Sequence, residues 1–85
     1  MTELPHQLKE VYWRSRRGML ELELRLVPFV RDCFESLSEA EQAVYVEMLA
    51  EEDWQIFDWL QGRVRPESAA MRALLVKILA HRGKL

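Results

Sequence analysis

The chain has 85 residues, of which 49% are hydrophobic and 31% charged, and its formal net charge is −2. This length supports one hydrophobic core and excludes two independent domains, while the composition excludes an intrinsically disordered chain. The slight acidity argues against nucleic-acid binding, which normally depends on a surplus of Lys and Arg. We therefore predict a single domain over residues 1–85 with no nucleic-acid partner.

The first predicted helix covers residues 5–16. Residues that fall on one face at helical spacing define it, and Trp13 lies beside that face. The residues that share the face are Leu4, Leu8, Val11, Tyr12 and Ser15.

The next segment, residues 20–26, alternates strictly between apolar and charged side chains, which is also the pattern of a half-buried strand. We predict a helix, because Leu, Glu and Arg are strong helix formers and no second strand is evident to pair with it. Pro28 should kink or break this helix about one turn earlier. Two buried flanks are expected, one with Leu22, Leu26, Phe29, Val30 and Cys33, the other with Leu20, Leu24, Val27 and Phe34.

Three further helices follow. Ser38 and Glu41 have capping-box spacing at the start of a helix that extends to about residue 50. Asp53 is a predicted N-cap for a short helix that ends at Gly62. Pro66 suits the first position of the last helix, with Glu67 in its first turn. Its inward residues are predicted to be Met71, Leu74, Leu75, Ile78 and Leu79. The predicted fold is an all-α, single-domain five-helix bundle.

Residues that could support catalysis or metal binding are scarce. His6 and His81 lie near opposite ends of the chain, and Cys33 lies on an apolar helix face, where we expect it to pack in the core. No glycine-rich phosphate loop is present. We therefore predict no enzymatic activity and no metal site.

The single cysteine cannot form an intramolecular disulfide, which indicates a reducing compartment. No segment approaches the roughly 20 apolar residues of a membrane span, and the N-terminus lacks the pattern of a signal peptide. We expect a cytoplasmic protein without direct membrane insertion.

The junction between the first two helices is rich in arginine: Arg14, Arg16 and Arg17 precede Gly18, and Glu21 follows. A structural interpretation pairs Arg17 with Glu21 at i,i+4 and makes Gly18 the left-handed residue that ends the first helix. A functional interpretation uses the arginines on acidic or carbonyl groups of a partner. The structural interpretation accounts well for Gly18 and Glu21 but less well for the arginines, because a cation opposes the dipole at a helix start. The residues alone leave both open.

Charge is also distributed unevenly. Every charged residue from Asp32 to Asp58 is acidic, and basic residues flank this block on both sides. The blocks either attract one another across helix surfaces or form a polarised docking surface, and the first alternative is favoured. Of the tryptophans, Trp59 is expected in the core and Trp54 is a candidate for exposure.

Residues 12–23, which contain Arg17, Gly18 and Glu21, together with Pro28 and Phe29, resemble the signature stretch of the succinate dehydrogenase assembly factor 2 family. This is the family of the bacterial FAD assembly factor of succinate dehydrogenase. Residues 49–60 are similar to its second characteristic segment, and the likeness covers nearly the whole chain.

The resemblance implies a chaperone that binds the flavoprotein subunit of succinate dehydrogenase, and often of fumarate reductase, and promotes covalent attachment of FAD to it. The FAD would belong to the partner, so no stably bound cofactor is expected. Arg17, Gly18 and Glu21 carry over as partner-binding residues, with Met19 and Leu20 as core spacers between them. Further partner-binding residues, expected to act as supports or contacts, are Arg14, Arg16 and Trp59.

Two alternatives accompany this hypothesis. An antitoxin-like regulatory module that binds another protein would fit the same small helical chain. For the oligomeric state, a monomer is expected, and a weak homodimer through exposed aromatic side chains is the alternative.

Overall fold

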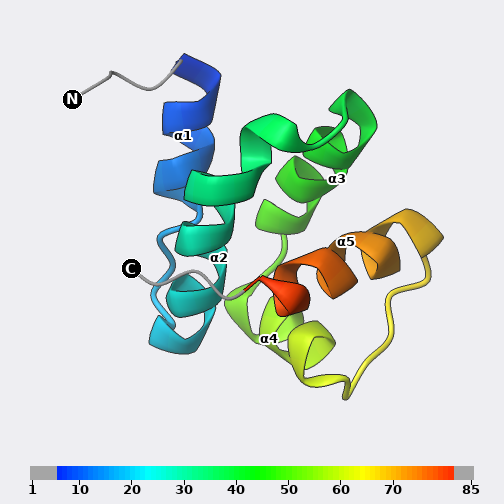
Figure 1. Ribbon diagram of the computed structural model, residues 1–85. Coiled ribbons are helices and arrows are strands. Elements are labelled where there is room, and N and C mark those ends of the chain that lie inside the picture. Colours follow the sequence, from blue (N-terminus) through cyan, green and yellow to red (C-terminus); the bar gives the residue numbers. More distant parts are fainter. Residues whose placement is uncertain (1–5, 82–85) are drawn as a thin grey trace.

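The computed structural model describes residues 6–81, with side chains from residue 8 onward. This part of the chain contains five α-helices and a short 3₁₀ helix, η1, joined by loops, and no strand (Figure 1). The all-α prediction with five helices is therefore confirmed. The elements are α1 (His6–Arg14), α2 (Leu20–Cys33), η1 (Phe34–Ser36), α3 (Glu39–Leu49), α4 (Asp53–Gln61) and α5 (Ala69–Ala80).

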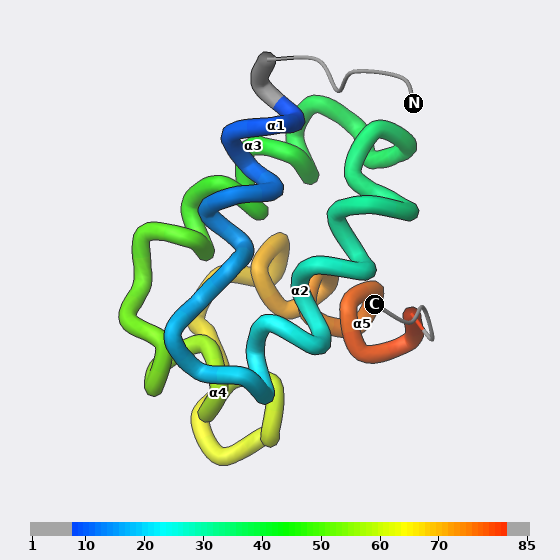
Figure 2. The backbone as a smooth tube through the Cα atoms, turned by 90° about the vertical axis from the view of Figure 1, so that its left-hand side faces the viewer, coloured from blue at the N-terminus to red at the C-terminus, as the bar shows by residue number. Residues whose placement is uncertain are grey.

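Helix α2 is the central element of the fold. It runs beside α1 and also contacts α4 and α5, while α3 packs on α5 (Figures 1 and 2). The side chains that these helices bury form one continuous hydrophobic cluster. Its most completely buried members are Leu22, Leu26, Met48, Tyr45, Ile56 and Ile78.

The predicted second buried flank of α2 is wrong for two leucines. Leu22 and Leu26 are buried, but Leu20 is 58% exposed and Leu24 is 48% exposed. Positions two apart on an α-helix differ by about 200°, so alternating leucines fall on opposite sides. Neighbouring helices cover only one of these sides.

Pro28 does not break α2, which continues as one helix to Cys33. A proline inside a helix typically costs about 3 kcal/mol. Burial of a large apolar side chain contributes about 1.5–3 kcal/mol each. The helix buries several such side chains on both sides of Pro28, among them Leu26, Phe29 and Val30. Core packing therefore outweighs the local penalty.

Of the four sequence signals predicted to start or end α3, α4 and α5, the structure confirms two. The capping box of α3 is present, with the Glu41 amide donating to Ser38 Oγ at 3.1 Å and the Ser38 amide donating to Glu41 Oε1 at 2.9 Å. Gly62 ends α4 with a φ of 77° in the left-handed region, where glycine is favoured. Asp53, however, is the first residue of α4 and not its N-cap, which is Glu52.

The start of α5 differs from the prediction. The helix begins at Ala69, and its N-cap is Ser68, whose Oγ accepts a hydrogen bond from the Met71 amide at 3.1 Å. Pro66 lies in the preceding loop, where its carbonyl accepts a hydrogen bond from Arg72 Nη1 at 2.7 Å. A serine cap satisfies an amide of the first turn, which Pro66 cannot do. Leu79, predicted to face inward, is exposed.

Helix α1 ends at Arg14 and not at residue 16, and its predicted start at residue 5 and Leu4 lie outside the described residues. Ser15 follows the helix and is fully buried. Its Oγ donates to the Val11 carbonyl at 2.9 Å and lies 2.6 Å from the Tyr45 hydroxyl. This contact ties the start of the α1–α2 loop to α3, and burial raises the pKa of Tyr45.

We expect Ser15→Ala to destabilise the fold more than Tyr45→Phe. Ser15→Ala leaves the buried Tyr45 hydroxyl without a partner, whereas Tyr45→Phe leaves Ser15 Oγ bonded to the Val11 carbonyl. The free energy of unfolding should fall by about 2 kcal/mol in the first variant and about 1 kcal/mol in the second. Urea denaturation followed by circular dichroism measures both, and the reverse order would contradict the assigned hydrogen bonds.

Candidate functional site

The loop between α1 and α2 holds the arginine-rich motif, and Arg17 fixes this loop to the corner between α3 and α4. The Arg17 side chain is only 15% exposed, and its Nε donates to Asp53 Oδ1 at 2.6 Å. Nη1 donates to the Leu49 carbonyl at 2.9 Å, and Nη2 donates to the Glu51 carbonyl at 2.7 Å. One guanidinium group therefore binds a carboxylate and two backbone carbonyls at the α3–α4 corner.

This arrangement is well suited to a guanidinium group. Leu49 is the last residue of α3, and its carbonyl lies at the negative end of the helix dipole. Arginine can bind several acceptors at once with its planar set of donors. The alternative pairing of Arg17 with Glu21 does not occur, since Arg17 forms its ion pair with Asp53. Arg17 acts as a clamp that fixes the position of the motif loop.

Gly18 follows Arg17 and is exposed. Within the described residues Gly62 is the glycine with a positive φ, so the interpretation of Gly18 as a left-handed helix end is wrong. A Cβ atom added at Gly18 would lie 3.7 Å from Asp53 Oδ2, which is an ordinary van der Waals distance. The fold therefore does not require glycine here. Because Gly18 has no side chain, the backbone at this position is exposed on the surface.

Glu21 lies in the first turn of α2, where a carboxylate is favoured by the helix dipole. Its side chain is exposed, and no other described residue forms an ion pair with it. Of the two residues between Gly18 and Glu21, Met19 packs against the core, as predicted, whereas Leu20 is exposed. The structure thus presents Gly18, Leu20 and Glu21 together on the surface.

Arg14 and Arg16 differ from Arg17 in their surroundings. Arg16 is exposed, its Nε lies 2.8 Å from Glu23 Oε1, and its guanidinium lies 5.5 Å from the centre of the Trp13 ring. Arg14 is exposed, and its carbonyl accepts a longer hydrogen bond of 3.4 Å from Arg17 Nη1. Both side chains remain at the surface, so they stay candidates for contact with a partner.

The expectations for the two tryptophans of α4 agree with the structure. Trp59 is partly buried and packs against the core, and Trp54 is largely exposed. Trp54 directly follows Asp53, so it lies next to the clamp formed by Arg17. A role of Trp59 in binding a partner remains a prediction.

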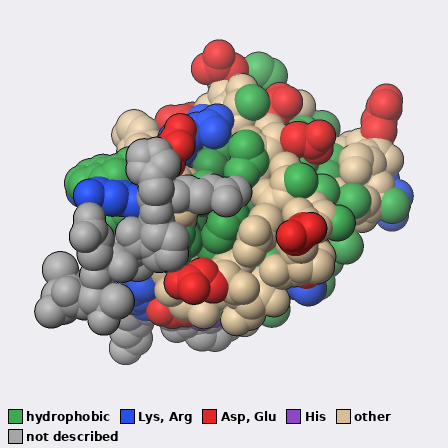
Figure 3. Space-filling model, turned by 90° about the horizontal axis from the view of Figure 1, so that it is seen from above, with side chains coloured by type: hydrophobic (Ala, Val, Ile, Leu, Met, Phe, Trp, Pro, Cys, Tyr) green, Lys and Arg blue, Asp and Glu red, His purple; other side chains and the backbone are tan. Residues whose placement is uncertain are grey.

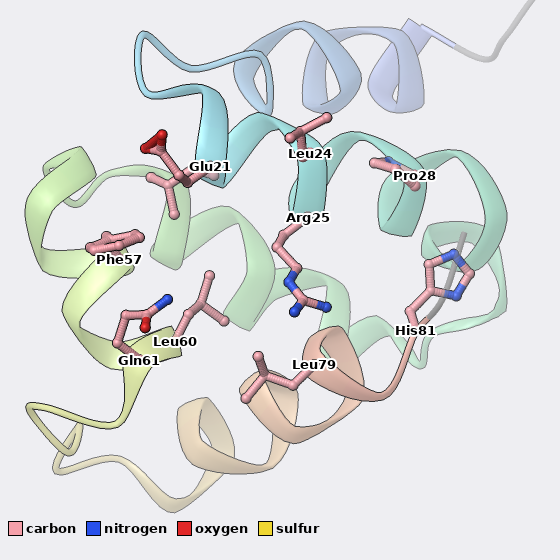
Figure 4. Close-up of a pocket in the computed structure, with 10 residues that line it drawn as sticks. Glu21, Leu24, Arg25, Pro28, Phe57, Leu60, Gln61, Leu79 and His81 are labelled. Carbon is pink, nitrogen blue, oxygen red and sulfur yellow. The ribbon is translucent and has the colours of Figure 1, made fainter. Parts of the chain in front are cut away.

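A groove of about 710 Å³ begins at Glu21 and lies between α2, α4 and α5 (Figure 4). No sequence pattern predicts it, because its residues come from α2, α4, α5 and the residue that follows α5, and only the fold brings them together. The residues that line it are Glu21, Leu22, Leu24, Arg25, Pro28, Phe57, Leu60, Gln61, Leu79 and His81.

Acidic and basic residues pair across helix surfaces, as the favoured interpretation of the charge blocks predicts. Arg17 pairs with Asp53, and Lys77 of α5 pairs with Glu41 of α3. On the face seen from above, acidic side chains form several separate groups with hydrophobic side chains between them (Figure 3). That face shows no single acidic patch.

A cluster of polar side chains separate from the Arg17 clamp lies at the end of α5 and consists of Asp32, Cys33 and His81. His81 Nδ1 lies 3.5 Å from Cys33 Sγ, and His81 Nε2 lies 2.9 Å from Asp32 Oδ2. Burial, and then the charge of Asp32, raises the pKa of the Cys33 thiol. A thiol with a raised pKa is a poor nucleophile at neutral pH. The cluster therefore joins α2 to the end of α5 without activating the cysteine.

Asp32 should make the stability depend on pH below about pH 4. Two hydrogen bonds from the Arg31 guanidinium, followed by the one with His81, lower the pKa of Asp32 from 3.8 to about 2. A lowered carboxyl pKa stabilises the folded state above the unfolded value, and this contribution is lost as the pH falls toward the folded value.

We therefore expect Asp32→Asn to lower Tm at pH 6, and the difference from wild type to shrink between pH 4 and pH 2. Thermal melts followed by circular dichroism over this range measure it. A difference that stays constant down to pH 2 would show that the charge of Asp32 does not contribute.

Within residues 6–81, no group of three or more His, Cys, Asp or Glu side chains is arranged to hold a metal ion. In the same part of the chain, no helix is both long and apolar enough to cross a membrane.

The sequence model of the family described as "Flavinator of succinate dehydrogenase" matches residues 9–82. The chain belongs to this family. The matched region contains the clamp, the exposed residues Gly18 and Glu21, and all the residues that line the groove. The resemblance predicted from the sequence is confirmed.

Individual members of the family are similar over most of their length. The FAD assembly factor SdhE of Vibrio cholerae is 41% identical over 75 residues, which cover 88% of this chain and 87% of the relative. The FAD assembly factor SdhE of Pseudomonas aeruginosa is 44% identical over 73 residues, covering 86% and 87%. That of Vibrio parahaemolyticus is 39% identical over 77 residues, covering 91% and 90%.

Proposed function

We propose that this chain binds the flavoprotein subunit of succinate dehydrogenase and promotes the covalent attachment of FAD to that subunit. The observation that carries the proposal is the exposed Gly18 backbone beside the exposed Glu21 carboxylate, in a chain that belongs to the flavinator family. The fold itself gives no reason for a glycine at this position, so contact with a partner is the better explanation.

Each residue of the motif has a distinct role in this proposal. Arg17 holds the loop on the α3–α4 corner and so sets the position of its neighbours. Gly18 permits close approach of the partner backbone, and Glu21 binds a basic group of the partner. Arg14 and Arg16 support the contact from the rim, and Trp59 acts mainly through packing.

The mechanism that we propose is conformational. The family resemblance implies that FAD is attached to a histidine of the flavoprotein, and the chain would favour the partner conformation in which that histidine faces the reactive methyl carbon of FAD. This positioning needs no catalytic side chain from the helper, and FAD stays bound to the flavoprotein. The chain would act in the cytoplasm as a monomer, and fumarate reductase, whose flavoprotein carries the same cofactor, would be a second partner.

Co-expression tests the function directly. The flavoprotein subunit is produced with and without this chain in a host that lacks a flavinator of its own, and covalent flavin is read by in-gel fluorescence. We expect a strong fluorescent flavoprotein band only when the chain is present. Equal bands in both cultures would contradict the proposed function.

A further inference from the structure

The groove between α2, α4 and α5 is continuous with the motif through Glu21, which lines one end of it (Figure 4). Its floor is apolar, because Leu22 and Leu60 are buried parts of the hydrophobic core. Phe57 packs against that core from α4 and also lines the groove. A partner that contacts Glu21 therefore meets an apolar depression directly beside it.

Leu79 provides apolar surface on the α5 side of the groove. It is 36% exposed, and it lines the groove from the last turn of α5. Leu24, on α2, is also exposed. Exposed apolar side chains around a concave surface are typical of protein interaction sites.

Two opposite charges lie along the groove without a partner from the described part of the chain. Glu21 and Arg25 are both exposed, and neither forms an ion pair with another described residue. They are spaced i,i+4 with the acid first, the favourable order for a pair within one helix. They nevertheless diverge, with Glu21 near Phe57 and the Arg25 guanidinium directed toward α5 and Leu79 (Figure 4).

We propose that this groove binds a segment of the flavoprotein subunit that carries a basic and an acidic side chain on either side of an aliphatic one. The basic group would pair with Glu21, the aliphatic group would pack on the apolar floor and Leu79, and the acidic group would bind Arg25. The inference rests on the function proposed above and extends the contact surface beyond the motif to α4 and α5.

Groove variants of the 85-residue chain test this surface through the Kd for the purified flavoprotein subunit, measured by isothermal titration calorimetry. We expect Leu79→Arg and Arg25→Glu each to raise Kd at least tenfold. Matched controls lie outside the groove: Val76→Arg, at a 67% exposed position of α5, and Arg65→Glu, at an exposed position of the loop before it. Both controls should stay within twofold of wild type.

Arg25→Glu keeps the test decisive if Leu79→Arg unfolds, because Arg25 is exposed and forms no ion pair with a described residue. Thermal melts establish the folded state of every variant. A folded Arg25→Glu chain with the Kd of wild type would overturn the groove inference and leave the proposed function standing. A wild-type chain that does not bind the flavoprotein would instead overturn the proposed function.

Photo-crosslinking identifies the occupant. A photoreactive benzoylphenylalanine at position 79 should crosslink to the flavoprotein, at a segment that carries an aliphatic side chain between a basic and an acidic one. Crosslinks that join two copies of this chain, or that reach a flavoprotein segment without those charges, would overturn the proposal. The same substitution at position 76 should give a much weaker flavoprotein crosslink.

Discussion

Gly18→Arg will abolish the gain in covalent flavin that the chain gives its partner, and the variant will remain folded. The new side chain starts from an exposed position of the α1–α2 loop and occupies the space into which we propose the partner backbone packs. In-gel flavin fluorescence of the co-expressed flavoprotein should fall to the level seen without the chain. The Kd for the flavoprotein should rise at least tenfold.

Two further variants separate size from charge at this position. Gly18→Leu should behave like Gly18→Arg, because bulk and not charge blocks the approach. Gly18→Ala should be as stable as wild type or more stable by about 0.4–1 kcal/mol, because the backbone conformation suits alanine and reduces the freedom of the unfolded chain. Its flavinylation should lie between the two extremes. A folded Gly18→Arg chain with full flavinylation would disprove the contact at Gly18.

Arg17→Ala should destabilise the fold by about 3 kcal/mol, since it leaves the Asp53 carboxylate and two backbone carbonyls without their common donor. For a domain of this size, that loss corresponds to a fall in Tm of more than about 10 °C. Thermal and urea denaturation measure it. Arg17→Lys should recover only part of the loss, because an ammonium group lacks the planar donors that reach all three acceptors.

Asp53→Ala is the matched variant for the clamp. It removes the carboxylate but leaves the hydrogen bonds from Arg17 to the Leu49 and Glu51 carbonyls, so a smaller loss of about 1–2 kcal/mol is expected. The double variant should lose less than the sum of the two single losses. If Arg17→Ala instead keeps the Tm of wild type while flavinylation disappears, Arg17 contacts the partner and does not act as an internal clamp.

A helix end is predicted correctly from the sequence where its signal lies within one helical turn and has no competing signal nearby. The Ser38–Glu41 capping box and the left-handed Gly62 each depend on residues within one turn, and both predictions are confirmed. The predicted start of α5 is wrong because Pro66 and Ser68 are both acceptable residues at the start of a helix, and the sequence does not choose between them. The hydrogen bond from Arg72 to the Pro66 carbonyl belongs to the folded loop, and no local pattern reveals it.

The alternating leucines of α2 show a second limit. The sequence shows which residues of α2 are apolar. Whether Leu20 and Leu24 are buried, however, depends on where α1, α4 and α5 pack. Burial of this kind is a property of the whole fold, so a single helix pattern cannot predict it.

For the candidate site, the sequence located the motif but not the partner of its arginine. Arg17 and Asp53 are separated by 36 positions, and only the packing of the α1–α2 loop on the α3–α4 corner brings them together. The groove combines residues from α2, α4 and α5 for the same reason. The motif residues are adjacent in sequence, whereas their supporting contacts are not.

The clamp at Arg17 also links partner binding to the folding equilibrium of the chain. The surface at Gly18 and Glu21 takes its shape from contacts that exist only in the folded state, so the flavoprotein should bind the folded chain and not the unfolded one. By mass action, a partner present at 100 times its Kd would add about 2.7 kcal/mol to the free energy of unfolding. A chain of marginal stability would thus persist while unfinished flavoprotein is available and become easier to degrade once that supply is exhausted.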